Sequence, residues 1–161
     1  MDKRYLLRGK VVNGGEWVVG YYLPVGYAKA GEVQHDIVVP SRDGGNLTWC
    51  KITLATLGRS TGLIATKSYR GDSEDARLVF EGDTVARTVA RLGNYRTIQG
   101  IVRFGGYSDG HVGFYIEWVD DDSDKWSEWW RKDLDYWITR EQCEIVGTIH
   151  EHPELLNGEE P

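Results

Sequence analysis

The stretch TVARTVARLGNYRTIQGIVRFGGYSDGHVGFYIEW, residues 84–118, decides the predicted fold. Within it, three segments alternate apolar with polar or small residues, as half-buried strands do: 84–89, 99–104 and 113–118. Glycine-containing turn sequences separate the segments, at 93–94 and at 105–110. We therefore predict three consecutive antiparallel strands in this part of the chain.

Further strand signals lie toward both ends of the chain. Residues 5–12 and 16–23 flank the turn Asn13-Gly14-Gly15, which indicates an N-terminal β-hairpin. Residues 144–151 alternate again and predict a final strand. Many short strands with turns between them predict a mostly β fold with a small barrel.

The length of 161 residues fits one domain of common size. Residues 41–82 mix short apolar pieces with glycines and show no clear period, so we interpret them as an irregular excursion. We predict a single domain over residues 1–161. It contains a hairpin and a strand in 1–40 and a barrel core in 83–156.

One helix is predicted, because aromatic residues recur at spacings of three and four after a capping Asp124. The members of this stripe are Trp126, Trp129, Trp130, Leu134 and Trp137. Such a stripe is typical of a buried core, but tryptophan is also enriched where proteins contact one another. We interpret Trp126, Trp129, Trp130 and Trp137 as a binding surface for a macromolecular partner.

The net charge of −6 argues against a broad phosphate-binding surface, so nucleic acid is not an expected partner. Positive residues nevertheless gather around Tyr95, at Arg87, Arg91, Arg96 and Arg103. A solvated sheet face explains this cluster. The alternative is a site in which Arg87, Arg91 and Arg103, with nearby aromatic rings, hold a nucleotide-like small molecule.

No set of residues predicts catalysis, a metal or a cofactor. Residues 58–62 match the GxSxG pattern, but no βαβ unit surrounds them. The acidic run 120–124 lacks the glycine and the closing glutamate of a calcium loop. It is interpreted as a solvated loop or, alternatively, as part of an acidic surface that mimics nucleic acid. His150 and His152 are expected on one face of the final strand, exposed or, alternatively, bound to a metal.

The expected location is the cytoplasm, without a membrane partner. Nowhere do eighteen apolar residues follow one another, and the first ten residues do not form a signal peptide. Cys50 and Cys143 form no CxxC pair and are expected to be reduced thiols.

Three separated parts of the chain resemble the YopX family of bacteriophage and prophage proteins. The first is Leu7-Arg8-Gly9-Lys10 followed by residues 16–22, and the second is residues 57–63 followed by Phe80-Glu81-Gly82-Asp83. The third and most specific is the terminal block EIVGTIHEHPELL, residues 144–156. The chain departs from the family pattern at His150, where the family usually carries a tyrosine.

This resemblance implies a phage-encoded protein of a bacterial cell, with a small SH3-like β barrel and a tendency to form homo-oligomers. The family has no established biochemical activity. We therefore expect a non-enzymatic protein that binds a host or phage macromolecule through its aromatic surface. The alternatives are an oligomer that sequesters a nucleotide-like small molecule and an acidic inhibitor that mimics nucleic acid.

Overall fold

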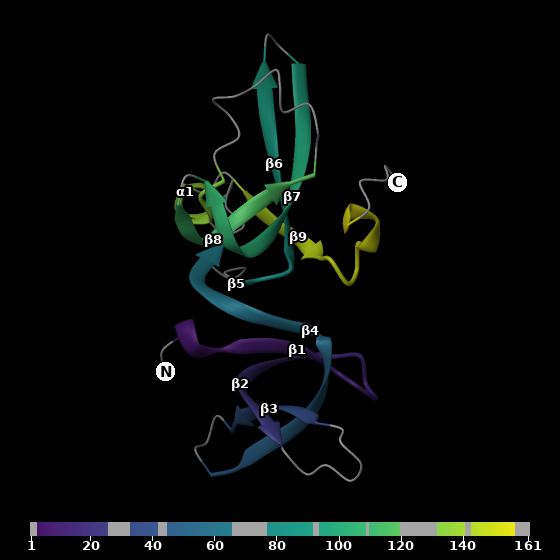
Figure 1. The fold of residues 1–161 in the computed structure, drawn as a ribbon. Helices are drawn as coiled ribbons and strands as arrows, with labels where there is room; N and C mark the ends of the chain where they lie inside the picture. Colours follow the sequence, from purple (N-terminus) through teal and green to yellow (C-terminus); the bar gives the residue numbers. More distant parts are fainter. Residues whose placement is uncertain are drawn as a thin grey trace. The chain divides into compact units, whose positions relative to one another are not determined.

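The computed structural model shows a mostly β chain with antiparallel strand pairing, which confirms the predicted fold class (Figure 1). The structure describes residues 3–25, 33–41, 45–65, 77–91, 94–108, 110–119, 132–140 and 143–156. Contacts divide the chain into two compact units. Unit 1 is Met1–Ser60 and unit 2 is Thr61–Pro161, and each is described by itself.

Unit 1 contains a sheet that closes on itself. After the short 3₁₀ helix η1 (Lys3–Tyr5), its strands are β1 (Leu7–Val11), β2 (Trp17–Val25), β3 (Gln34–Pro40) and the first part of β4 (Leu47–Ala65). Strand β1 pairs with both β2 and β4, and β3 pairs with β2 and β4. The four strands therefore form a small barrel-like sheet, and the finer SH3-like assignment stays a prediction.

The predicted N-terminal hairpin is confirmed by β1 and β2. Gly15 in the connecting turn has a φ of 67°, a conformation that glycine adopts without strain. Lys10 pairs with Trp17 across the hairpin, and the Arg8 guanidinium carbon lies 4.7 Å from the centre of the Trp17 ring. The two cations over one indole ring hold the start of β2 against β1.

The prediction of an irregular excursion over residues 41–82 is wrong for Leu47–Ala65, which form the single long strand β4. Its burial does not alternate regularly, because the strand pairs first with β3 and then with β1. The β1 register also shifts between Arg8 and Lys10, as at a β-bulge. A strand that changes partners in this way does not show a period of two in its sequence.

Unit 2 contains β5 (Arg77–Phe80), β6 (Asp83–Arg91), β7 (Asn94–Ser108), β8 (His111–Trp118), α1 (Leu134–Thr139), β9 (Glu144–Thr148) and the 3₁₀ helix η4 (Pro153–Leu156). Strand β5 pairs with β4, and four other strands form a sheet in the order β8-β7-β6-β9. The three strands predicted in residues 84–118 are confirmed as β6, β7 and β8. Among the described residues, strand pairing closes in unit 1 and not within 83–156, where the barrel core was predicted.

Helix α1 covers the core of unit 2. Its buried residues are Leu134, Trp137 and Ile138. They pack with buried residues of β6, β7 and β8, of which Val85, Val102 and Ile116 are fully buried. The expected short helix is thus confirmed for 134–139, and the part of it predicted from Asp124 onward lies outside the described residues.

Candidate functional site

A groove of about 390 Å³ lies at the turn end of the β7–β8 hairpin in unit 2. Its lining residues are Gly106, Tyr107, Gly110, His111, Val112, Tyr115, Glu117 and Lys132. We call it the hairpin groove. Its volume lies within the range of roughly 300–1,000 Å³ that small-molecule sites occupy.

Local strand geometry positions the aromatic side chains of the groove. The β7–β8 register shifts between Gly106 and Ser108, so Tyr107 occupies a β-bulge that re-aims its side chain. Gly110, with a φ of 87°, turns the chain into β8. In β8, alternation places His111 and Tyr115 on the same face of the strand.

The tyrosine rings of the groove form a stacked pair. The ring centres of Tyr107 and Tyr115 lie 5.3 Å apart at an angle of 23° between planes. The His111 ring lies 6.0 Å from Tyr107 on the same side of the hairpin. The Tyr107 hydroxyl donates a 2.9 Å hydrogen bond to Oδ1 of Asp133, which fixes the ring at its far end. The aromatic wall is therefore held in place before any ligand arrives.

The segment before helix α1 forms the other side of the groove. Asp133 makes an antiparallel bridge with Tyr115, and the Ile116 amide donates a 2.8 Å hydrogen bond to the Lys132 carbonyl. These contacts attach residues 132–133 to the outer edge of β8. Because the backbone is held on the strand, the exposed Lys132 side chain stays at the rim of the groove.

The charged groups at or beside the groove are the Arg103–Glu117 ion pair, Lys132 and Asp133. Arg103 Nε donates a 2.8 Å hydrogen bond to Oε2 of Glu117, with side-chain exposures of 31% and 52%. An exposed pair of this kind adds little to stability, roughly 0–1 kcal/mol. Two cations, Arg103 and Lys132, and two carboxylates, Glu117 and Asp133, therefore lie at or beside the groove.

Stacked aromatic rings beside a cation can bind a planar, electron-rich group that carries a negative charge. Within the described residues, no three His, Cys, Asp or Glu side chains are placed to hold a metal ion.

Two of the predicted binding residues, Arg87 and Trp137, come together in the interior of unit 2. The Arg87 guanidinium carbon lies 3.8 Å from the centre of the Trp137 ring, and the two residues are only 7% and 4% exposed. The prediction that Trp137 belongs to an exposed binding surface is therefore wrong. Arg87 likewise contacts the core rather than a ligand at the surface, because β6 places it beneath helix α1.

Burial changes the acid–base properties of this interior cluster. Removal from water lowers the pKa of Arg87 from its usual value. It also raises the pKa of the Cys143 thiol to about 12, with the nearby Arg87 charge acting in the opposite direction. Both shifts favour neutral forms, as is typical of structural rather than reactive groups.

Of the remaining predicted site residues, the structure describes the side chain of Arg103. Arg103 borders the hairpin groove through its pairing with Tyr115 and its ion pair with Glu117. Arg91 lies at the end of β6, and its side chain is outside what the structure describes. Trp126, Trp129 and Trp130, predicted as a binding surface, also lie outside the described residues.

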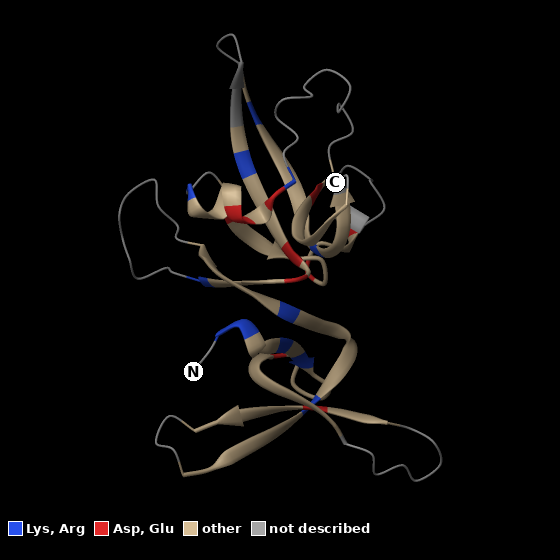
Figure 2. Cartoon of the chain, turned by 60° about the vertical axis from the view of Figure 1, so that its left-hand side comes forward, with Lys and Arg blue, Asp and Glu red and all other residues tan. Residues whose placement is uncertain are grey.

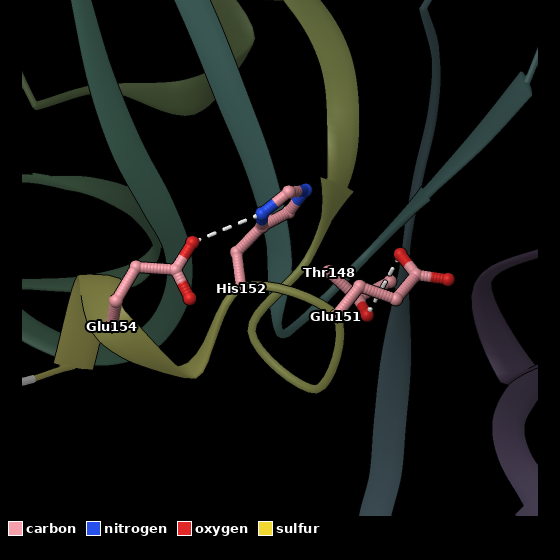
Figure 3. Close-up of polar contacts among 4 residues, drawn as sticks. All are labelled: Thr148, Glu151, His152 and Glu154. Carbon is pink, nitrogen blue, oxygen red and sulfur yellow. Dashed lines mark hydrogen bonds and ion pairs between the residues drawn. The ribbon is translucent and has the colours of Figure 1, made fainter. Parts of the chain in front are cut away.

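The terminal histidines do not share a strand face, because β9 ends at Thr148 and a turn follows (Figure 3). His152 Nδ1 lies 3.1 Å from Oε1 of Glu154, while the Thr148 hydroxyl donates a 3.2 Å hydrogen bond to Glu151. A Cβ atom on Gly147 would lie 2.7 Å from the His152 ring, so the ring packs on bare backbone. The prediction of a strand through residue 151 is wrong for its last three residues.

Four residues of the groove were not predicted from the sequence as site residues: Tyr107, His111, Tyr115 and Lys132. Alternation in the segment HVGFYIEW would have placed His111 and Tyr115 on one face. The bulge at Tyr107 and the approach of Lys132 have no comparable signal, because they depend on pairing between distant segments.

No family model matches the chain, and no curated protein and no solved structure shows a significant similarity to it. The resemblance to the YopX family therefore stays a prediction. No helix in the described part of the chain is long and apolar enough to cross a membrane.

Proposed function

We propose that this chain is a non-enzymatic binding protein that holds a planar, nucleotide-like ligand in the hairpin groove. The observation that carries the proposal is the stacked pair Tyr107–Tyr115 lining an open groove. A phage origin, membership of the YopX family, assembly into homo-oligomers and a place in the bacterial cytoplasm belong to the proposal as expectations from the resemblance.

Stacking supplies the main attraction in this proposal. A base that stacks on an aromatic side chain gains about 1–3 kcal/mol, and every base offers a flat face. The hydrogen bond from Tyr107 to Asp133 lowers the cost of ordering the ring when the ligand arrives.

Charge supplies selectivity for an anionic ligand. Lys132 at the rim provides an ammonium donor for a phosphate group. The Arg103–Glu117 pair places a guanidinium beside Tyr115 as a second cation, and its carboxylate is already neutralised. We therefore expect a nucleoside monophosphate to bind more tightly than the corresponding nucleoside.

Isothermal titration of the full chain with the four common nucleoside monophosphates, adenosine and ribose 5-phosphate tests this function. We expect AMP to bind, adenosine to bind more weakly, and Tyr115→Ala to lower AMP affinity about tenfold through the lost stacking. Tyr95→Ala is the matched control, because Tyr95 is 78% exposed in the same unit and outside the groove. A chain that binds none of the four common nucleoside monophosphates at millimolar concentration would contradict the proposal.

An exposed apolar face in unit 1 favours a second candidate function, which is contact with a macromolecule through aromatic residues. Tyr21 on β2 and Trp49 on β4 lie on either side of Val38, which is buried on the central strand β3. Trp49 is 55% exposed, and Leu47 on the same strand face is 61% exposed. Sedimentation of the wild type and of Trp49→Ser tests whether this face joins copies of the chain, since loss of an oligomer in the variant alone supports it.

A further inference from the structure

The carboxylate of Glu117 keeps hydrogen-bonding capacity at the hairpin groove. Glu117 lines the groove, and its side chain is 52% exposed. In the described part of the chain, Arg103 is the one residue that donates to this carboxylate, from Nε to Oε2. An ionised carboxylate has about four acceptor positions on its two oxygens. Oε1 and part of Oε2 therefore remain as acceptors for a ligand.

Strand geometry places this acceptor beside the stacked rings. Tyr115 and Glu117 are two positions apart in β8, so they lie on the same face of the strand. Tyr107 stacks on Tyr115 from the turn end of the hairpin. The Tyr115 ring also leans toward that end, because its Cε1 lies 3.9 Å from the position of a Cβ atom on Gly105. A base that stacks on the other face of the Tyr115 ring therefore lies on the side of Glu117.

Individual charged groups decide what unit 2 attracts. Figure 2 shows both blue and red segments on the strands of this unit. At the groove, cations and carboxylates are equal in number, and the Asp133 carboxylate already accepts the hydrogen bond from the Tyr107 hydroxyl. In such a balanced site, the placing of donors and acceptors selects the ligand more than the total charge does. Glu117 is then the acceptor that the edge of a base meets.

We infer that the hairpin groove prefers guanine among the common bases, with Glu117 as the residue that determines this specificity. The inference rests on the proposed binding of nucleotides in the same groove. Guanine carries two neighbouring donors on its Watson–Crick edge, the ring N1–H and the exocyclic N2 amino group. A carboxylate accepts both together, one on each oxygen. Stacking on Tyr115 is common to all bases, so the carboxylate supplies the difference between them.

The other bases meet the carboxylate with fewer donors. Adenine and cytosine place the lone pair of a ring nitrogen beside their amino group, and uracil has one ring N–H between two carbonyl oxygens. An acceptor directed at a carboxylate leaves both groups without a hydrogen bond and lowers affinity. The guanidinium of Arg103 can donate to O6 of guanine or to a ring nitrogen of adenine, so it does not distinguish these two bases. The second donor of guanine therefore decides.

Isothermal titration of the full chain with GMP, IMP, AMP, CMP and UMP tests the inference. IMP differs from GMP by the loss of the N2 amino group, so it isolates one of the two donors. We expect GMP to bind at least about tenfold more tightly than AMP, CMP or UMP, with IMP between GMP and AMP, since a bidentate contact to a base changes affinity about 5- to 150-fold.

Glu117→Gln is expected to lower the ratio of GMP to AMP affinity at least about tenfold, because an amide presents one donor and one acceptor to the base edge. The ratio is the decisive quantity, since loss of a carboxylate also strengthens the attraction of the groove for every phosphate. The matched control is Glu144→Gln, which removes an exposed carboxylate of β9 outside the groove and should leave the ratio unchanged.

The outcomes separate this inference from the proposed function. Equal affinities for GMP and AMP would overturn the guanine preference and leave nucleotide binding in place. An unchanged ratio in Glu117→Gln, or an equal fall in Glu144→Gln, would overturn the role of Glu117. Absence of binding for every nucleotide would overturn the inference together with the proposed function.

Discussion

Two aromatic clusters of unit 2 have similar composition and opposite environments. In the interior, Trp137 makes edge contacts with Tyr136 and Trp118 and carries Arg87 on its face. At the hairpin groove, Tyr107 stacks on Tyr115 beside His111, and the lining is open. Ring content therefore does not distinguish a core from a binding surface.

The arginines beside these two clusters differ in the same way, because one is buried and the other is in contact with solvent. Arg87 is buried on Trp137, and its pKa is lowered by loss of water. Arg103 keeps contact with solvent and pairs with Glu117. The Arg87 guanidinium is therefore part of the packing, whereas the Arg103 guanidinium lies in contact with solvent beside the groove.

The largest expected effect is that of Trp137→Ala. Removing a buried indole should lower the free energy of unfolding by about 3–5 kcal/mol, because the cavity also leaves the Arg87 charge without its ring. Urea unfolding followed by circular dichroism measures the loss. Trp137→Phe should lose a smaller part, and a loss below about 1 kcal/mol for Trp137→Ala would mean that this cluster does not support the fold.

Two glycine-to-alanine substitutions compare how closely the β7–β8 hairpin is packed near the core and near its turn. A Cβ atom on Gly100 would meet Ile116 Cγ2 and would lie 2.9 Å from Trp118 Cε3. Gly100→Ala should therefore cost about 1–3 kcal/mol in unfolding free energy. Gly113→Ala, where nothing lies within 4 Å of the added atom, should change it by less than about 0.5 kcal/mol. Equal effects of the two changes in thermal or urea melts would contradict the difference.

The buried thiol makes the interior cluster sensitive to high pH. The unfolded chain releases the Cys143 proton near pH 9.0, whereas the folded chain holds it until a pKa of about 12. Stability from this group is thus complete below pH 9 and should fall by about 1.4 kcal/mol per pH unit between these values. Urea unfolding across this range should show a shallower fall for Cys143→Ala than for the wild type, and identical slopes would refute the assignment.

A moderate effect is expected for Tyr107→Phe in the hairpin groove. The variant keeps the stacked ring and loses the 2.9 Å hydrogen bond to Asp133. Loss of one such bond should cost about 0.5–1.5 kcal/mol in unfolding free energy. It should also weaken AMP binding by less than Tyr115→Ala does, as titration calorimetry can measure. A larger effect on binding than that of Tyr115→Ala would show that the hydroxyl contacts the ligand.

The sequence predicted the fold well where apolar alternation and glycine turns occur together. The hairpin of β1 and β2 and the run from β6 to β8 follow from alternation and glycine turns. It failed at β4, where Gly58 and Gly62 lie inside a strand that exchanges one partner for another. Such an exchange depends on distant segments, which a local pattern does not contain.

The candidate site was less predictable than the fold. The tryptophan stripe predicted a binding role for Trp137, but the structure places this residue in the core. The hairpin groove depends on a bulge at Tyr107 and on the approach of Lys132 to the edge of β8, and neither follows from residue type. Arginine clustering was visible in the sequence, but only the structure separates the buried Arg87 from the exposed Arg96.

The pairing of β1 with β4 also fixes an order of events during synthesis. Leu7 finds its partner in Arg59, near the end of unit 1, while its hairpin partner Gly20 is available much earlier. A nascent chain can therefore form the hairpin as soon as β2 has emerged, but β1 keeps one unsatisfied edge until β4 arrives. In that interval the early chain offers an open strand edge to chaperones or to other chains.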